Sequence, residues 1–110
     1  LEDICRFLLD HRTLSSRCKR LRHEIKDHVI EYFPVLAACR DTAADVGRGN
    51  TIASEQRRTG IRDMVMANAK RAAESVRVLE EVFKLLGGRG SIKAIRYRIY
   101  IIEKDILRLV

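Results

Sequence analysis

The sequence contains no tryptophan and only one proline, and aromatic residues make up 5% of it. So few aromatic rings argue against a surface on which nucleic-acid bases stack. One proline and six glycines leave little room for the many turns of a β-rich domain. No apolar run approaches the roughly eighteen residues of a membrane-spanning helix. These absences favour a helical domain that does not associate with a membrane.

Charge of one sign is in excess, because 22 Lys and Arg residues stand against 15 Asp and Glu residues, a formal net charge of +7. The cations are spread along the chain rather than gathered in a tail, which favours phosphorylated metabolites over nucleic acid as partners. Cys5, Cys18 and Cys39 are an odd number without metal-type spacing. We therefore expect reduced thiols in a cytoplasmic protein with one modest core.

Apolar residues recur at helical spacing in four stretches, 1–9, 14–33, 61–86 and 92–109. Pro34 should end or kink the second helix, and Gly87 with Gly88 should end the third. The expected apolar residues of the third helix are Ile61, Val65, Ala72, Leu79, Val82 and Leu86, and those of the fourth are Ile95, Ile99, Ile102, Ile106 and Leu109.

The segment 40–59 has no sustained apolar period and is rich in residues that form turns. At this length it is long for a connection within a compact domain, and such loops are usually functional or disordered. Ser54 could cap a short turn that carries Glu55, Arg57 and Arg58.

Two parts of the sequence look alike. LEDICRFL at 1–8 matches LEEVFKLL at 79–86, and with a shorter intervening loop LRHEI at 21–25 then falls against IRYRI at 95–99. We therefore predict an all-α bundle of two antiparallel αα-hairpins with an internal pseudo-two-fold repeat. The first hairpin would span 1–39 and the second 60–110, joined by the loop. The alternative is that any two amphipathic hairpins look alike.

If the duplication is real, the first copy lacks a counterpart of NAKRAAESVRV at 68–78. We then expect the natural chain to extend upstream with a pattern such as N-x-x-R-x-x-E-x-x-R. A shortened first helix would expose part of its apolar stripe, so a homodimer is a further expectation.

Four motifs together resemble one bacterial domain family: RDTAADVG at 40–47, SEQRR at 54–58, ANAKRAAESVRVLEE at 67–81 and LRH at 21–23. The family occurs as the N-terminal domain of some thiamine-phosphate synthases and as a free-standing protein, and it is associated with hydroxymethylpyrimidine-phosphate kinase activity. The resemblance covers essentially the whole chain. It implies a thiamine-pathway domain that acts on the phosphorylated pyrimidine with ATP and Mg²⁺, and a possible fusion to a synthase barrel.

Phosphoryl transfer to a monophosphate depends mostly on positioning and charge neutralisation. The acceptor phosphate is largely dianionic at neutral pH, because its second pKa is about 6, so a strong general base is unnecessary. We predict catalytic roles for Asp41, Asp45 and Lys70, with Asp41 and Asp45 also holding Mg²⁺. The residues predicted to bind the substrate or its phosphate are Arg40, Thr42, Gly47, Arg58, Asn68, Arg71 and Glu74.

Each prediction has a simpler alternative. In that alternative, Asp41 and Asp45 only cap a turn, and Lys70 only pairs with Glu74 on a solvated helix face. The whole chain could be a non-catalytic accessory or dimerisation domain of a synthase or, less favoured, a basic nucleic-acid-binding module. We further expect residues 68–74 to serve function and residues 78–86 to serve stability, so that Asn68→Ala or Lys70→Ala abolishes activity at an unchanged melting temperature.

Overall fold

The computed structural model describes residues 1–53, 56–88 and 92–110. Its elements are a short π-helix η1 (Ile4–Leu8), α1 (Arg12–Val29), a 3-10 turn η2 (Ile30–Tyr32), α2 (Phe33–Ala38), α3 (Ile61–Leu85) and α4 (Ile92–Leu107). No strand occurs in these three ranges. The expected all-α class is confirmed.

Helix α4 lies at the centre of the packing, because it contacts both α3 and α1. Its buried residues recur every three or four positions, as predicted, and are Ile92, Ile95, Ile99, Ile102 and Ile106. Leu109, also expected to be buried, lies beyond the helix and is half exposed. The same core contains residues of the other elements: Leu14, Cys18 and Leu21 of α1, Ile4 and Cys5 of η1, and Val65, Ala73 and Val76 of α3. An ion pair of 2.7 Å between Arg17 and Asp105 ties α1 to α4 at the edge of the core.

Helix α3 ends within one residue of its predicted C-terminus, and its expected apolar seam is confirmed in part: Val65 is buried, and Ala72 and Leu79 pack, partly buried, against the core. The buried residues of α3 are Val65, Ala69, Ala73 and Val76, whereas Ile61, Val82 and Leu86 are exposed. Small side chains at 69 and 73 let α4 come close, so its large isoleucines fill the interface from the other side. Full burial is therefore concentrated in 65–76, while Leu79 and Phe83 of the stretch 78–86 pack, partly buried, against the core. The expectation that 78–86 serves stability stays a prediction.

The helix predicted over 14–33 is divided into three pieces. Helix α1 begins at Arg12, where the ring of His11 accepts a hydrogen bond from the backbone N–H of Leu14 (3.2 Å), and it ends at Val29. Pro34 lies in the first turn of α2, where its missing N–H leaves no hydrogen bond unmade. Pro34 thus helps to start a short helix and does not itself end the long one.

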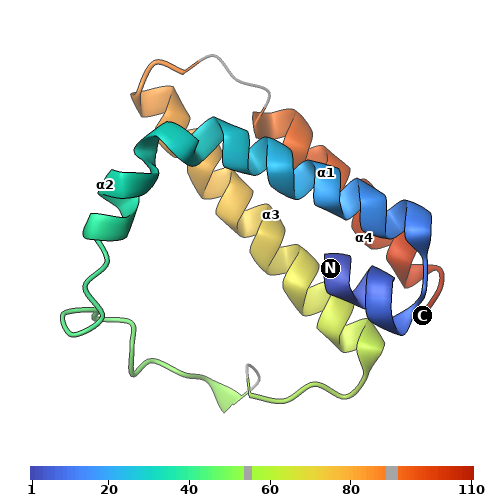
Figure 1. The fold of residues 1–110 in the computed structure, drawn as a ribbon. Helices are drawn as coiled ribbons and strands as arrows, with labels where there is room; N and C mark the ends of the chain where they lie inside the picture. The colour runs from blue at the N-terminus through green and yellow to red at the C-terminus, as the bar shows by residue number, and fades with distance from the viewer. Residues whose placement is uncertain (54–55, 89–91) are drawn as a thin grey trace.

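The segment from Ile30 to Gly60 has no buried residue among those the structure describes. Figure 1 shows its loop running outside the helices from α2 to the start of α3. The radius of gyration, 15.7 Å, accordingly exceeds the about 13 Å of a compact chain near this length. The predicted loop is confirmed, and it is open.

Helices α3 and α4 form an antiparallel hairpin. Arg62 at the start of α3 donates a hydrogen bond of 3.2 Å to the carbonyl oxygen of Leu107 at the end of α4. Gly87 ends α3 with a left-handed φ of 71°, the conformation that favours glycine there. The descent of this hairpin and of η1–α1 from one repeat stays a prediction. The helices in the described part of the chain include none long and apolar enough to cross a membrane.

Candidate functional site

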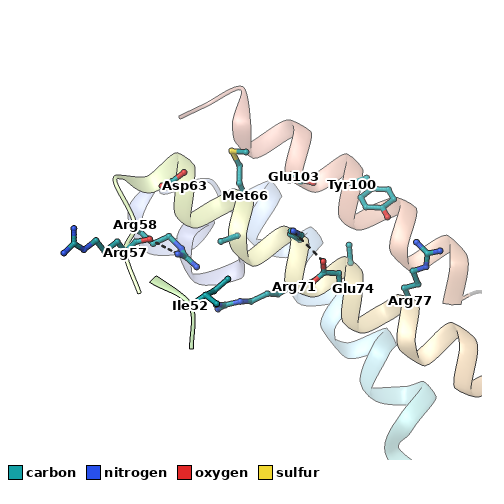
Figure 2. A pocket seen from close by; sticks show the side chains of 13 residues that line it. Ile52, Arg57, Arg58, Asp63, Met66, Arg71, Glu74, Arg77, Tyr100 and Glu103 are labelled. Carbon is teal, nitrogen blue, oxygen red and sulfur yellow. Dashed lines mark hydrogen bonds and ion pairs between the residues drawn. The ribbon is translucent and has the colours of Figure 1, made fainter. Parts of the chain in front are cut away.

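The exposed side of α3 forms the floor of an open trough of about 750 Å³, which we call the cationic trough. Loop residues border it on one side and α4 on the other (Figure 2). Its lining residues are Ile52, Arg57, Arg58, Asp63, Met66, Ala67, Lys70, Arg71, Ala73, Glu74, Arg77, Tyr100 and Glu103.

Positive charge predominates among the described residues that line the trough, where five cationic side chains stand against three carboxylates. Lys70 and Glu74, one helical turn apart, approach only to 3.9 Å, and their side chains are 77% and 64% exposed. So loose a pair in water holds its partners weakly. The ammonium group of Lys70 is therefore accessible to an anion that enters the trough.

The loop end of the trough is fixed to α3 by Asp63. Its Oδ2 atom accepts hydrogen bonds from the backbone N–H of Thr59 (3.2 Å) and from the Thr59 hydroxyl (2.9 Å). These bonds lower the pKa of the Asp63 carboxyl, because they stabilise its charged form. The guanidinium of Arg58 in turn donates to the carbonyl oxygen of Arg57 (2.7 Å).

Four of the predicted site residues come together in the trough: Arg58, Lys70, Arg71 and Glu74. Asn68 does not join them. A residue two positions before Lys70 in a helix lies about 200° around the helix axis from it. Asn68 accordingly lines a separate pocket with Ala72. Its side-chain amide donates to the carbonyl oxygen of Met64 (2.8 Å) in the same helix.

The other five predicted site residues, Arg40, Asp41, Thr42, Asp45 and Gly47, lie in the exposed loop and do not line the trough. Oδ1 of Asp41 accepts from the backbone N–H groups of Ala43 and Ala44 (both 3.1 Å). Oδ1 of Asp45 accepts from the N–H of Gly47 (2.9 Å). Both aspartates therefore shape turns, as the simpler alternative has it, while their role as Mg²⁺ ligands stays a prediction. Ser54 and Glu55 of the expected capped turn lie outside the described residues.

No three His, Cys, Asp or Glu side chains converge in a metal-binding group within the described ranges. The residues that were not expected at the site include Tyr100 and Glu103, which α4 brings to the trough. Their three-residue spacing places them on one helix face, but only the packing of α4 against α3 shows that this face meets Lys70 and Arg77.

A model of the ThiD2 family matches residues 1–105. The chain belongs to the ThiD2 family. Among curated proteins it is similar to thiamine-phosphate synthases of Synechocystis sp. (39% identity, 97% of this chain and 31% of the synthase) and Nostoc punctiforme (38%, 97% and 30%). A third, from Rhodopirellula baltica, is 34% identical over 91% of this chain and 28% of the synthase.

This ThiD2-family chain thus spans about 30% of the length of the first curated relatives it matches. No solved structure matches it. The resemblance that the motifs indicated, to a thiamine-biosynthesis domain related to part of thiamine-phosphate synthases, is confirmed.

Proposed function

We propose that this ThiD2-family domain serves thiamine biosynthesis by binding hydroxymethylpyrimidine phosphate in the cationic trough and phosphorylating it with ATP. The single observation that carries the proposal is the convergence of Arg57, Arg58, Lys70, Arg71 and Arg77 on one open surface. Several cations from two elements match a reaction in which two phosphorylated molecules must approach each other against charge repulsion.

The chemistry needs few other groups. An oxygen of the acceptor phosphate attacks the γ-phosphorus of ATP, the bond from that phosphorus to the bridging β–γ oxygen breaks, and ADP leaves. The acceptor oxygen is already ionised at neutral pH, so Lys70 and Arg71 act by neutralising and orienting phosphate oxygens. Neither has to remove a proton.

Mg²⁺ is the metal that such a reaction implies, and it is commonly held by one or two carboxylates together with the substrate phosphates. Glu74 and Glu103 line the trough and would supply such oxygens there. Bound Mg²⁺ would neutralise charge on the phosphates. The alternative ligands, Asp41 and Asp45, belong to the loop.

The names of the relatives favour a second function, that of an accessory domain within a thiamine-phosphate synthase. Exposed apolar side chains on α2, among them Phe33, Val35 and Leu36, support a surface that another domain covers. In that case the trough would bind a phosphorylated intermediate without transferring a phosphoryl group.

A turnover assay in the natural full-length protein separates the two functions. We expect ATP, Mg²⁺ and hydroxymethylpyrimidine phosphate to yield the pyrimidine pyrophosphate and ADP, followed by ³¹P NMR. Arg71→Gln should reduce the rate strongly, whereas Lys104→Gln, which changes an exposed cation of α4 outside the trough, should not. Binding of the pyrimidine phosphate without any turnover would overturn the kinase proposal in favour of the accessory domain.

A further inference from the structure

Among the described residues that line the cationic trough, Tyr100 is the one aromatic residue. It projects from α4 on the side of α3 away from Ile52 and the loop (Figure 2), and its side chain is 40% exposed. The other apolar lining residues are aliphatic or Met66. A ligand that carries a flat ring beside its phosphates thus meets a single aromatic surface in this trough.

The position of Tyr100 is fixed by an ion pair beneath it. The guanidinium of Arg96 donates a hydrogen bond of 3.3 Å to the Tyr100 hydroxyl and lies 6.0 Å from the centre of the Tyr100 ring. The same guanidinium pairs with Oε2 of Glu80 on α3 at 3.1 Å. The side chains of Arg96 and Glu80 are only 16% and 14% exposed, the best enclosed of the ion pairs in the described ranges.

Tyr97 contacts both Tyr100 and Arg96. Its ring lies 5.9 Å from that of Tyr100 at an angle of 88°, an edge-to-face contact, and 5.4 Å from the Arg96 guanidinium. Glu80, Arg96 and Tyr97 thereby limit the rotations of Tyr100 from two helices. A ring restrained in this way loses little conformational entropy when a ligand stacks on it.

A second ion pair in the molecule provides a natural comparison. Arg22 pairs with Glu2 at 2.9 Å, and the two occupy the positions that align with Arg96 and Glu80 in the internal match. Where the second half has Tyr100, the first half has Lys26. The Arg22 side chain is 62% exposed, and the residue one turn further along α1, Lys26, carries no ring. An ion pair at these aligned positions therefore forms without a tyrosine beside it. The Tyr100 ring thus has a role other than supporting the Glu80–Arg96 pair.

We propose that Tyr100 determines specificity by stacking against the planar ring of the ligand, and that the Glu80–Arg96 ion pair is its positioning device. The proposal rests on the proposed function, because it assigns the heteroaromatic ring of a phosphorylated pyrimidine to the α4 wall and its phosphates to Lys70 and Arg71. It makes the trough selective for ring-bearing phosphates over simple ones.

Two probes test this: hydroxymethylpyrimidine phosphate, which has a ring, and inorganic pyrophosphate, which has none. Affinities are measured by calorimetry, and the tyrosine ring signals are followed by NMR with ¹³C-labelled tyrosine. Since the chain holds three tyrosines and no tryptophan, Tyr97→Phe and Tyr100→Phe assign the signals. We expect the Tyr100 ring signal to shift with the pyrimidine phosphate and to stay nearly unchanged with pyrophosphate.

Tyr100→Leu should weaken binding of the pyrimidine phosphate roughly five- to tenfold, as for loss of one aromatic contact, and leave pyrophosphate binding unchanged. Tyr100→Phe keeps the ring and should lose less. Glu80→Gln should give a smaller loss than Tyr100→Leu, again confined to the pyrimidine phosphate, whereas the matched variant Glu2→Gln should bind both probes as the unaltered protein does. Circular dichroism confirms that each variant is folded.

The outcomes separate this inference from the proposed function. If the unaltered protein binds neither probe, both are overturned. If it binds both probes and Tyr100→Leu weakens them equally or not at all, stacking on Tyr100 is overturned and the phosphate-binding trough stands. Equal losses in Glu80→Gln and Glu2→Gln would show that the ion pair serves stability alone, and would overturn its positioning role.

Discussion

Polar side chains are held in place differently on the packed helices and in the segment 30–60. On α3, the buried face of Val65, Ala69, Ala73 and Val76 fixes the rotation of the helix, and this places Lys70, Arg71 and Glu74 along the trough. Among the described residues of the loop none is buried to do the same, and Asp41 and Asp45 accept hydrogen bonds from the backbone of their own turns. Polar residues on the helix are thus held in place by the packing of the helix, whereas the described polar residues of the loop are ordered by local hydrogen bonds.

The largest expected effect concerns the core that orients α3 and α4. Ile95 is fully buried, whereas Ile101 on the same helix is 52% exposed. Ile95→Ala should lower the free energy of unfolding by about 2–5 kcal/mol, since it leaves a cavity between the helices. Urea denaturation followed by circular dichroism measures this change.

Ile101→Ala is the matched control, and its cost should be well below that of Ile95→Ala. Equal losses in the two variants would mean that α4 does not pack as described, and the distinction between packed helices and open segment would lose its basis.

The second prediction compares two faces of α3. Lys70→Ala should reduce phosphoryl transfer about 10- to 100-fold, as expected for loss of a hydrogen bond to a charged group, at a nearly unchanged melting temperature. Its exposed pairing with Glu74 contributes little to stability.

Asn68→Ala is the control on the opposite face, and here the structure changes the expectation drawn from the sequence. Because Asn68 lines another pocket and bonds Met64, we now expect activity close to that of the unaltered protein. A loss as large as that of Lys70→Ala would show that Asn68 contacts the substrate after all and that the trough is incomplete.

The sequence was sufficient to predict α3, α4 and the loop, because each has a strong local signal: apolar periodicity, the glycines after α3 and the polar run 40–59. It did not predict that the helix over 14–33 is divided at Ile30 and Phe33. It was sufficient for Lys70, Arg71 and Glu74 as one group, since their spacing on a helix brings them near one another. It indicated the buried side of α3 only in part and missed Ala69 and Ala73, because alanine carries a weak apolar signal and its burial here depends on the packing of α4. Tyr100 was missed because its place at the trough depends on how α4 packs against α3.

The third prediction uses acid to weaken one contact between the packed helices. The Arg17 guanidinium lowers the pKa of the Asp105 carboxyl below its ordinary value, mainly through their hydrogen bond. A lowered pKa in the folded state means that this contact stabilises the fold above the unfolded-state pKa of about 3.9 and is lost as the pH falls further.

Asp105→Asn should therefore melt at a lower temperature than the unaltered protein at pH 6, and the difference should shrink as the pH approaches 3. Asp27→Asn, a change at an exposed position of α1, serves as the control. A difference that stays constant between pH 6 and pH 3 would mean that Asp105 acts through packing rather than through its charge.

The last prediction concerns the three cysteine thiols, where we expect the smallest change in stability. It compares the packed helices directly with the segment 30–60. Cys5 and Cys18 lie in the packed core, and burial raises the pKa of both thiols, that of Cys18 to about 11. Cys39, just after α2, is exposed.

Since the thiolate is the reactive form, iodoacetamide at pH 8 should modify one cysteine of the folded protein and all three in denaturant, as counted by mass spectrometry. Cys39→Ser should abolish the rapid modification and change the free energy of unfolding by less than about 0.5 kcal/mol. Rapid modification of a second cysteine would mean that Cys5 or Cys18 lies outside the core and that η1 does not pack against α1 as described.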